Sequence, residues 1–251
     1  MCEPDYVNNN ITLYYKDCLE VFPHISDNSI DMIFCDLPYS ITACKWDIPI
    51  PIEPLWGHYK RIIKPQGVIV LTASQPFTSL LVMSNLSMFR YEWIWEKSQG
   101  TNPLNAKYMP LKKHESILVF YKKRGVYNPQ MTKGDPYNGF ESKVKNIGEV
   151  YGDVKSVHKK NDGTRYPTTI QHFKHDKTKL HPTQKPLLLV EYFVKTYSNE
   201  GDVVLDNAFG SGTTAIACIN LNRQFIGMEN DIEYFSKSVK RIEDSISPFF
   251  S

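Results

Sequence analysis

The sequence predicts an α/β fold, with a doubly wound, mostly parallel sheet and helices on both faces. Three observations lead to this prediction. The chain has 251 residues and 41% hydrophobic content, enough for one sizeable core. Residues 202–229 read as a buried strand, a glycine-rich turn, an apolar helix and a second strand. A further apolar run at residues 29–35 reads as another buried strand. We therefore expect one domain spanning residues 1–251.

The composition excludes several classes of protein. No apolar run reaches the roughly eighteen residues that a membrane span needs, and the first residues are too polar for a signal peptide. The five cysteines are scattered and contain no CxxC pair, so we expect neither a disulfide framework nor a metal site. A net charge of +2 does not by itself argue for a nucleic-acid partner. These features predict a cytoplasmic protein with reduced thiols and no membrane attachment.

The last third of the chain carries the clearest pattern. Strands at residues 202–206 and 223–229 alternate with helices at residues 213–220 and 233–243. Glycines in the turn at residues 207–212 let the backbone approach a ligand, and the free N–H groups of the following helix favour a negative group.

An acidic residue completes this unit at the end of its second strand. Glu229 lies where a carboxylate would accept hydrogen bonds from ribose hydroxyls, so the unit is typical of a nucleoside site. The same glycine pattern also fits a nicotinamide-dinucleotide site, or a tight turn without a ligand. No Gly-Lys-Ser/Thr follows the glycines, which argues against a nucleoside-triphosphate loop.

A second group of candidate residues follows the strand at residues 29–35. This strand delivers Asp36, Leu37, Pro38 and Tyr39 to its C-terminal end. In a parallel sheet that end faces the ligand crevice, so an acid and an aromatic ring would emerge beside the glycine turn. A plain turn that ends the strand is the alternative interpretation, because Asp and Pro are ordinary turn residues.

Together these two groups resemble a known family. The run Asp-Leu-Pro-Tyr at residues 36–39 resembles the DPPY catalytic motif of amino-group DNA methyltransferases, and residues 206–212 resemble their cofactor motif. His-Pro-Thr-Gln-Lys-Pro at residues 181–186 is similar to the motif that precedes the cofactor strand. A catalytic motif placed before the cofactor motif resembles the β group, which includes adenine-N6 and cytosine-N4 enzymes. The resemblance covers about residues 12–244, apart from a middle segment, and implies a Rossmann-like methyltransferase sheet of about seven strands.

The resemblance implies methylation of adenine N6 in a specific sequence of double-stranded DNA, with S-adenosylmethionine as the methyl donor and the target base flipped out of the duplex. Asp36 and the main-chain carbonyl of Leu37 would accept the two amino N–H bonds. Pro38 would hold the turn, and Tyr39 would stack on the base. The family most often has proline at position 37, but the expected role there needs only a backbone carbonyl.

Other functions stay open at this point. Cytosine N4, RNA or a protein amide are alternative acceptors for the same chemistry. A nicotinamide-dependent oxidoreductase and a non-catalytic DNA-binding module are alternatives from other classes. A stand-alone methylase, the partner of a restriction nuclease and a viral enzyme would share these residues.

The resemblance also implies a set of cofactor contacts. The methionine part of the cofactor would lie over the glycine turn, with its amino group near Asp206 and its carboxylate at the helix N-terminus. Lys185 would reach the same carboxylate, with a solvated surface lysine as the alternative; Asp17 would contact the adenine, with a helix N-cap as the alternative. The predicted cofactor-binding residues are Asp17, Cys18, Thr183, Gln184, Lys185, Asp206, Phe209, Gly210, Ser211, Gly212, Thr213, Glu229 and Asn230.

Between the two motifs, residues 67–73, 91–95 and 117–121 read as further strands of the same sheet. The alternation at residues 91–95 is more typical of a strand with one buried face than of a platform for base stacking.

DNA contacts are predicted in three places. Residues 125–179 lack clear periodicity, are rich in Lys, Asn, Gly and Tyr, and are too long for an ordinary connection, so we expect a target-recognition insertion rather than a merely solvated one. Lys45 and Trp46 resemble a TxxKWD element of related adenine enzymes; the tryptophan would close over the flipped base or be buried. A basic loop near residues 107–113 would contact the DNA backbone. The predicted DNA-binding residues are Lys45, Trp46, Lys107, Lys112, Lys113, Lys159, Lys160 and Arg165. Association with the nucleoid through DNA would follow, and a homodimer is implied by the resemblance alone.

Overall fold

The computed structural model describes residues 2–39, 49–138, 160–177 and 184–246. The chain forms two compact units. The main unit consists of Met1–Asn128 and Thr169–Ser251, and the inserted unit consists of Pro129–Thr168. The inserted unit therefore falls within the segment at residues 125–179 that the sequence marks as an insertion, while both ends of that segment belong to the main unit.

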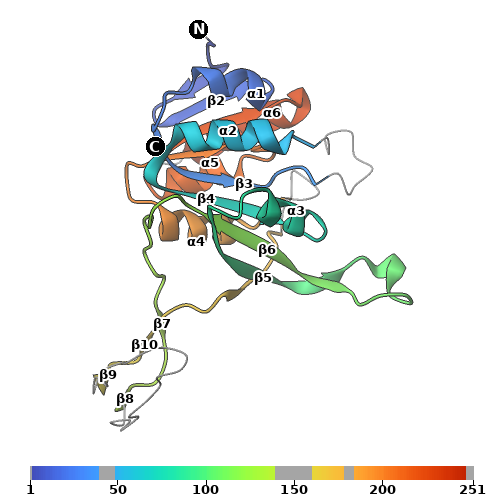
Figure 1. The fold of residues 1–251 in the computed structure, drawn as a ribbon, viewed down its shortest axis with the longest axis vertical. Helices are drawn as coiled ribbons and strands as arrows, with labels where there is room; N and C mark the ends of the chain where they lie inside the picture. The colour runs from blue at the N-terminus through green and yellow to red at the C-terminus, as the bar shows by residue number, and fades with distance from the viewer. Residues whose placement is uncertain (1, 40–48, 139–159, 178–183, 247–251) are drawn as a thin grey trace. The chain divides into compact units, whose positions relative to one another are not determined.

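Among the described residues, the main unit is built on a nine-stranded sheet in the order β1-β2-β13-β12-β3-β4-β6-β5-β11. Figure 1 shows its neighbouring strands β3, β4, β6 and β5. The strands are β1 (Tyr6–Asn8), β2 (Ile11–Tyr15), β3 (Ile30–Cys35), β4 (Ile63–Ala73), β5 (Phe89–Thr101), β6 (Lys112–Phe120), β11 (Ile170–Phe173), β12 (Val203–Asp206) and β13 (Gln224–Glu229). The five neighbours from β2 to β4 are parallel, and β6 runs antiparallel between β4 and β5. The predicted mostly parallel sheet is confirmed.

The sheet has two strands more than the seven expected. The short strand β1 pairs antiparallel with β2, and β11 pairs parallel with β5, so both lie at the edges. An open edge presents unpaired N–H and C=O groups, which a short segment can satisfy without a strong sequence pattern of its own.

Helices cover both faces of the sheet. The helices are α1 (Cys18–Val21), α2 (Ile52–Ile62), α3 (Phe77–Ser84), α4 (Leu187–Tyr197), α5 (Thr213–Asn220) and α6 (Ile232–Ile246), with 3-10 turns at Phe22–His24 and Pro103–Asn105. One apolar core joins the sheet to α4, α5 and α6, and a second joins it to α1, α2 and α3. None of the described helices combines the length and apolar composition needed to cross a bilayer.

The central strand β3 shows why the sequence reads as a continuous apolar run there. Met32 and Phe34 pack into the first core, whereas Ile33 and Cys35 pack into the second. A strand that is buried on both faces needs apolar residues at every position, which is the pattern of a parallel strand between two helical layers.

Strands β5 and β6 form a long antiparallel hairpin, and both extend beyond the ranges expected from sequence. In β5, Trp93 and Trp95 are buried while Glu92 and Ile94 are partly exposed, as expected for a strand with one buried face. The tip of the hairpin lies between Thr101 and Lys112, which are paired partners.

The inserted unit contains two short antiparallel pairs. Strand β7 (Thr132–Lys133) pairs with β10 (Thr164–Arg165), and β8 (Tyr137–Asn138) pairs with β9 (Lys160–Asn161). The guanidinium of Arg165 lies 4.7 Å from the centre of the Tyr137 ring and donates to the carbonyl of Asp135 at 2.5 Å. These contacts link the two strand pairs within the described residues of the unit.

Candidate active site

The two predicted motifs lie at the ends of neighbouring strands. Asp36 directly follows β3, Asp206 ends β12, and these two strands pair in parallel. Because parallel strands end at the same edge of a sheet, both carboxylates reach one cavity of about 530 Å³. The cavity is lined by Asp36, Leu37, Pro38 and Tyr39 from the first motif and by Asp206, Phe209, Gly210, Ser211 and Thr213 from the second.

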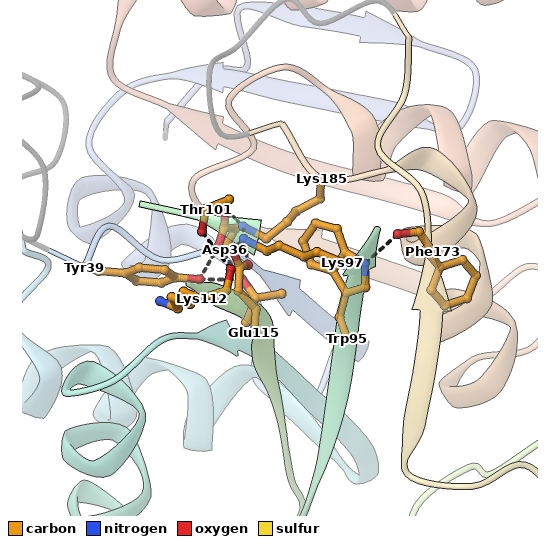
Figure 2. A network of polar contacts seen from close by, with 10 residues as sticks. Asp36, Tyr39, Trp95, Lys97, Thr101, Lys112, Glu115, Phe173 and Lys185 are labelled. Carbon is orange, nitrogen blue, oxygen red and sulfur yellow. Dashed lines mark hydrogen bonds and ion pairs between the residues drawn. The ribbon is translucent and has the colours of Figure 1, made fainter. Parts of the chain in front are cut away.

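The carboxylate of Asp36 is surrounded by three donors (Figure 2). Its Oδ1 accepts hydrogen bonds from the hydroxyl of Tyr39 at 2.6 Å and from the hydroxyl of Thr72. Its Oδ2 accepts from the ammonium of Lys185 at 2.5 Å. Burial and the charge of Asp36 hold the pKa of Tyr39 well above its usual range, so this phenol keeps its proton and donates.

The ring of Tyr39 packs against a second aromatic ring. Its centroid lies 5.2 Å from that of Phe77, the first residue of α3. The ring also lines the cavity, which leaves part of it available to a planar ligand.

Lys185 belongs to a larger group of buried charges. Its Nζ lies 3.4 Å from Oε2 of Glu115 on β6, and Oε1 of Glu115 lies 2.5 Å from Nζ of Lys97 on β5. Burial acts to raise the pKa of Glu115, but Lys185 and Lys97 outweigh it and lower that pKa to about 2. For Lys185, burial acts to lower the pKa, but Asp36 and Glu115 outweigh it and raise the pKa. Both groups are therefore charged at neutral pH.

The position of Lys185 differs from a solvated surface lysine, because its side chain is only 9% exposed. It contacts the carboxylate of the catalytic motif, whereas the resemblance led us to expect it at the cofactor's carboxylate. Its neighbour Gln184 donates from its side-chain amide to the carboxylate of Asp176 at 3.2 Å. Thr183, the third predicted residue of this motif, lies outside the described residues.

The glycine turn joins β12 to α5 in a conformation that needs glycine. Gly210 and Gly212 have φ values of +49° and +74°, in the left-handed region. A Cβ on Gly212 would also lie 3.3 Å from Cβ of Ser238 on α6. The N–H of Gly210 donates to Oε2 of Glu229 at 2.9 Å, so this carboxylate holds the turn besides lining the cavity.

Asp206 is buried, and its hydrogen-bond donors are neutral groups. It accepts hydrogen bonds from the hydroxyl of Thr214 at 2.7 Å and from the N–H of Ala208 at 3.2 Å. Burial raises the pKa of Asp206 to about 7, although these hydrogen bonds act to lower it. A cation bound at this point would stabilise the ionised carboxylate, so Asp206 fits the amino group of an amino-acid ligand.

The residues predicted around the nucleoside part also line the cavity. Asp17 is the N-cap of α1 and accepts from the N–H of Leu19 at 2.8 Å. The helix-cap interpretation is therefore confirmed, and Asp17 faces the cavity as well. Cys18 is buried, and its Sγ accepts a hydrogen bond from the side-chain amide of Asn207 at 3.7 Å. Asn230 and its neighbour Glu229 both line the cavity.

The predicted DNA-binding residues lie in different surroundings. Lys112 lines the cavity, where burial lowers its pKa. Lys113 forms an ion pair with Glu96 at 2.9 Å and stays half exposed. Lys107 is exposed on the tip of the β5–β6 hairpin.

The remaining predicted DNA contacts are elsewhere in the chain. Lys160 and Arg165 belong to the inserted unit. Lys45, Trp46 and Lys159 lie outside the described residues.

Several residues of the site escaped the sequence interpretation. They are Thr72 and Ser74 at the end of β4, Trp95 and Lys97 on β5, and Glu115 on β6. Strand β6 brings Glu115 opposite Trp95, and that pairing depends on the hairpin register. Glu115 lies just before the run at residues 117–121 that reads as a strand, so no local pattern marked it as a site residue. Among the described residues, no group of His, Cys, Asp and Glu is arranged to hold a metal ion.

Comparison with known proteins points to one family. The N6/N4 methyltransferase family model, described as DNA methylase, matches residues 30–240. The chain is 27% identical to the type II methyltransferase M.HpaI of Haemophilus parainfluenzae, over 95% of this chain and 76% of that protein. It is 28% identical to the DNA adenine methyltransferase YhdJ of Escherichia coli (strain K12), over 96% of this chain and 86% of that protein.

Solved structures agree with the sequence comparison. The complex of M1.HpyAVI with SAM has a TM-score of 0.63 and 26% identity, covering 92% of this chain and 99% of that one. The cytosine-N4-specific PvuII DNA methyltransferase has a TM-score of 0.68 at 16% identity, covering 98% of this chain and 94% of that one, which shows a shared fold alone.

Proposed function

The chain belongs to the DNA methylase family of amino-group N6/N4 methyltransferases, and we propose that it methylates N6 of adenine in a specific sequence of double-stranded DNA, with S-adenosylmethionine as the methyl donor. Its curated relatives include proteins named as type II methyltransferases and as a DNA adenine methyltransferase. The observation that carries the proposal is the shared cavity: Asp36 and Tyr39 face the same space as the glycine turn and Asp206.

The chemistry explains why these groups are needed together. The lone pair of an adenine amino group is delocalised into the ring, so the nitrogen is a weak nucleophile. Asp36 and the main-chain carbonyl of Leu37 would accept its two N–H bonds and favour a tetrahedral nitrogen with a localised lone pair. When the C–N bond forms, the sulfonium–methyl bond breaks, the sulfur becomes a neutral thioether and one amino proton leaves for solvent.

The other end of the cavity fits the methyl donor. S-adenosylmethionine supplies a methyl group bound to a positively charged sulfur. Asp206 would pair with its amino group, and the N-terminus of α5 would favour its carboxylate. Glu229 and Asp17 would contact its nucleoside.

A target base reaches this cavity only if it leaves the duplex, so the proposal includes base flipping at a cost of about a few kcal/mol. The ring of Tyr39, supported by Phe77, offers a face for stacking on the base. A flat, partly exposed ring beside the acceptor carboxylate supports this role.

DNA contact is proposed for two described parts of the chain. On the β5–β6 hairpin, Leu104 and Tyr108 are 91% and 85% exposed, and they flank the basic Lys107. The inserted unit carries Lys160 and Arg165, and we propose that it reads the target sequence. A homodimer, a cytoplasmic location with nucleoid association and a partner restriction nuclease stay predictions. Sedimentation of the purified chain would test the first of these.

Product analysis tests the function directly. Plasmid DNA is incubated with the protein and S-adenosylmethionine, digested to nucleosides and analysed by mass spectrometry, with Asp36→Ala as the inactive control. We expect N6-methyladenine from the wild type alone, and long-read sequencing then gives the sequence context. N4-methylcytosine without N6-methyladenine would move the target to cytosine. Absence of any methylated nucleoside would favour a non-catalytic DNA-binding module. The match to the DNA methylase family argues against the alternative of a nicotinamide-dependent oxidoreductase.

A further inference from the structure

Four alternating charges connect the catalytic carboxylate to the outer part of the sheet (Figure 2). Asp36 pairs with Lys185 at 2.5 Å, Lys185 lies 3.4 Å from Glu115, and Glu115 pairs with Lys97 at 2.5 Å. The side chains of the last three are 9%, 13% and 8% exposed. We call this group the charge chain.

The charge chain joins parts of the sequence that are far apart. Asp36 follows β3, Lys185 precedes α4, Glu115 lies on β6 and Lys97 lies on β5. Buried ion pairs are a weak source of stability, because the loss of hydration offsets most of the attraction between the charges. All four residues line the cavity, so their arrangement points to the reaction rather than to the core.

Lys185 binds the carboxylate oxygen of Asp36 that the two hydroxyl groups do not contact. Tyr39 and Thr72 hold Oδ1, while Lys185 holds Oδ2. A carboxylate has about four lone-pair sites, so three donors orient it and leave capacity for an amino N–H.

We propose that Lys185 is a positioning residue for methyl transfer, kept in place by Glu115 and Lys97, and that it acts on Asp36 rather than anchoring the cofactor. This inference rests on the proposed function. Glu115 would hold the ammonium on the side opposite Asp36, and Lys97 would balance the remaining charge of Glu115. The chain would then act as a rigid support whose loss changes the rate of the chemical step.

The test separates cofactor binding from the chemical step. Single-turnover methylation is measured at saturating S-adenosylmethionine and DNA, and the Kd of the cofactor is measured by calorimetry. For Lys185→Met we expect a rate about 100-fold lower, with the cofactor Kd within about threefold of the wild type. Lys185→Arg keeps a charged donor and should retain a rate within about tenfold. Lys64→Met is the matched control, because this lysine is 41% exposed and pairs with Asp31 at 2.7 Å outside the cavity; its single-turnover rate should be unchanged.

Two further variants keep the inference testable if Lys185→Met fails to fold. Glu115→Gln should lower the single-turnover rate about tenfold without raising the Kd of the cofactor. Lys185→Ala should regain rate when propylammonium is added but not when an equal concentration of sodium chloride is added, a response that a purely structural lysine would not give.

Opposite results would overturn the inference. A Lys185→Met protein with a wild-type rate at saturating cofactor and a Kd raised tenfold or more would make Lys185 a cofactor anchor. A wild-type single-turnover rate for Glu115→Gln would show that the charge chain does not support the chemical step. If the wild type itself forms no methylated base, the proposed function fails, and the failure is visible before any variant is compared.

Discussion

Two aspartates at the ends of adjacent strands have opposite surroundings. Asp36 receives two hydroxyl donors and the ammonium of Lys185. Asp206 accepts hydrogen bonds from the hydroxyl of Thr214 and from the backbone N–H of Ala208. Burial raises the pKa of Asp206 to about 7. Both line the same cavity.

The difference shows how one cavity divides its electrostatic tasks. The protein supplies the counter-charge for Asp36, so this carboxylate is ready as an acceptor before a substrate arrives. Under the proposed function, the cofactor would supply the counter-charge for Asp206, so the free energy of ionising this buried carboxylate would be coupled to cofactor binding. In the proposed function, Asp36 would therefore serve the reaction and Asp206 would serve cofactor binding.

The largest expected effect separates the two aspartates directly. Asp36→Asn should lower the single-turnover methylation rate about 1000-fold, because the acceptor for the amino N–H loses its charge. The cofactor Kd, measured by calorimetry, should stay within about threefold. A rate within tenfold of the wild type would show that Asp36 is not the main acceptor.

The complementary change should act on binding. Asp206→Asn should raise the Kd of S-adenosylmethionine about 30-fold. This corresponds to about 2 kcal/mol, the contribution of a hydrogen bond to a charged group. The rate at saturating cofactor should change far less than it does in Asp36→Asn. Asp27→Asn, at an exposed pair with Arg61, provides the control and should leave the cofactor Kd unchanged. An unaltered Kd for Asp206→Asn would place the amino group elsewhere.

The pH dependence of binding sharpens the same contrast. The pKa of Asp206 in the folded protein is about 7, above the ordinary value of 3.8. The protonated form therefore favours folding below about pH 4, and this contribution is lost as the pH rises towards 7. Because a bound ammonium needs the ionised form, the cofactor Kd should tighten about tenfold between pH 5.5 and 7. Calorimetry should show this trend in the wild type and a flat profile in Asp206→Asn; a wild-type profile that is also flat would contradict it.

The smallest expected effect concerns the hydroxyl donors of Asp36. Thr72→Val keeps the shape of the side chain but removes one donor to Oδ1, while Tyr39 remains. The single-turnover rate should fall about fivefold, since a single hydrogen bond contributes about 1 kcal/mol and the other two donors to Asp36 remain. Thr196→Val, a buried threonine on α4 that bonds to the carbonyl of Tyr192, should leave that rate unchanged. An equal loss in both variants would indicate a general packing effect.

Local patterns were sufficient for the cofactor end of the fold. The predicted helix at residues 213–220 coincides with α5, and the strands on either side agree within one residue. Strands buried on both faces and a glycine turn are each encoded within a few neighbouring residues. The same reasoning found β3 and the four residues that follow it.

Long-range pairing explains what the sequence did not reveal. The partner of Lys185 depends on how β3, β6 and the start of α4 meet, and no local spacing encodes this meeting. Strand β11 was not predicted, because it lies in the segment at residues 125–179 that lacks periodicity. It is a short strand whose backbone pairs with the edge of β5. Lys97 and Glu115 lie just outside the strands predicted at residues 91–95 and 117–121, and only the folded hairpin brings them together.

The inserted unit begins and ends at two fixed points of the main unit. The side-chain amide of Asn128 donates to the carbonyls of Lys195 and Ser198 at 3.2 and 3.1 Å, and the carbonyl of Thr169 accepts from the N–H of Ile94 at 2.7 Å. Since both joints are anchored in the scaffold, the forty residues between Asn128 and Thr169 can be replaced as a cassette while the sheet keeps its register. If the inserted unit reads the target sequence, as proposed, exchange at these two joints would give evolution and protein engineering a route to new target preferences without a change in the active site.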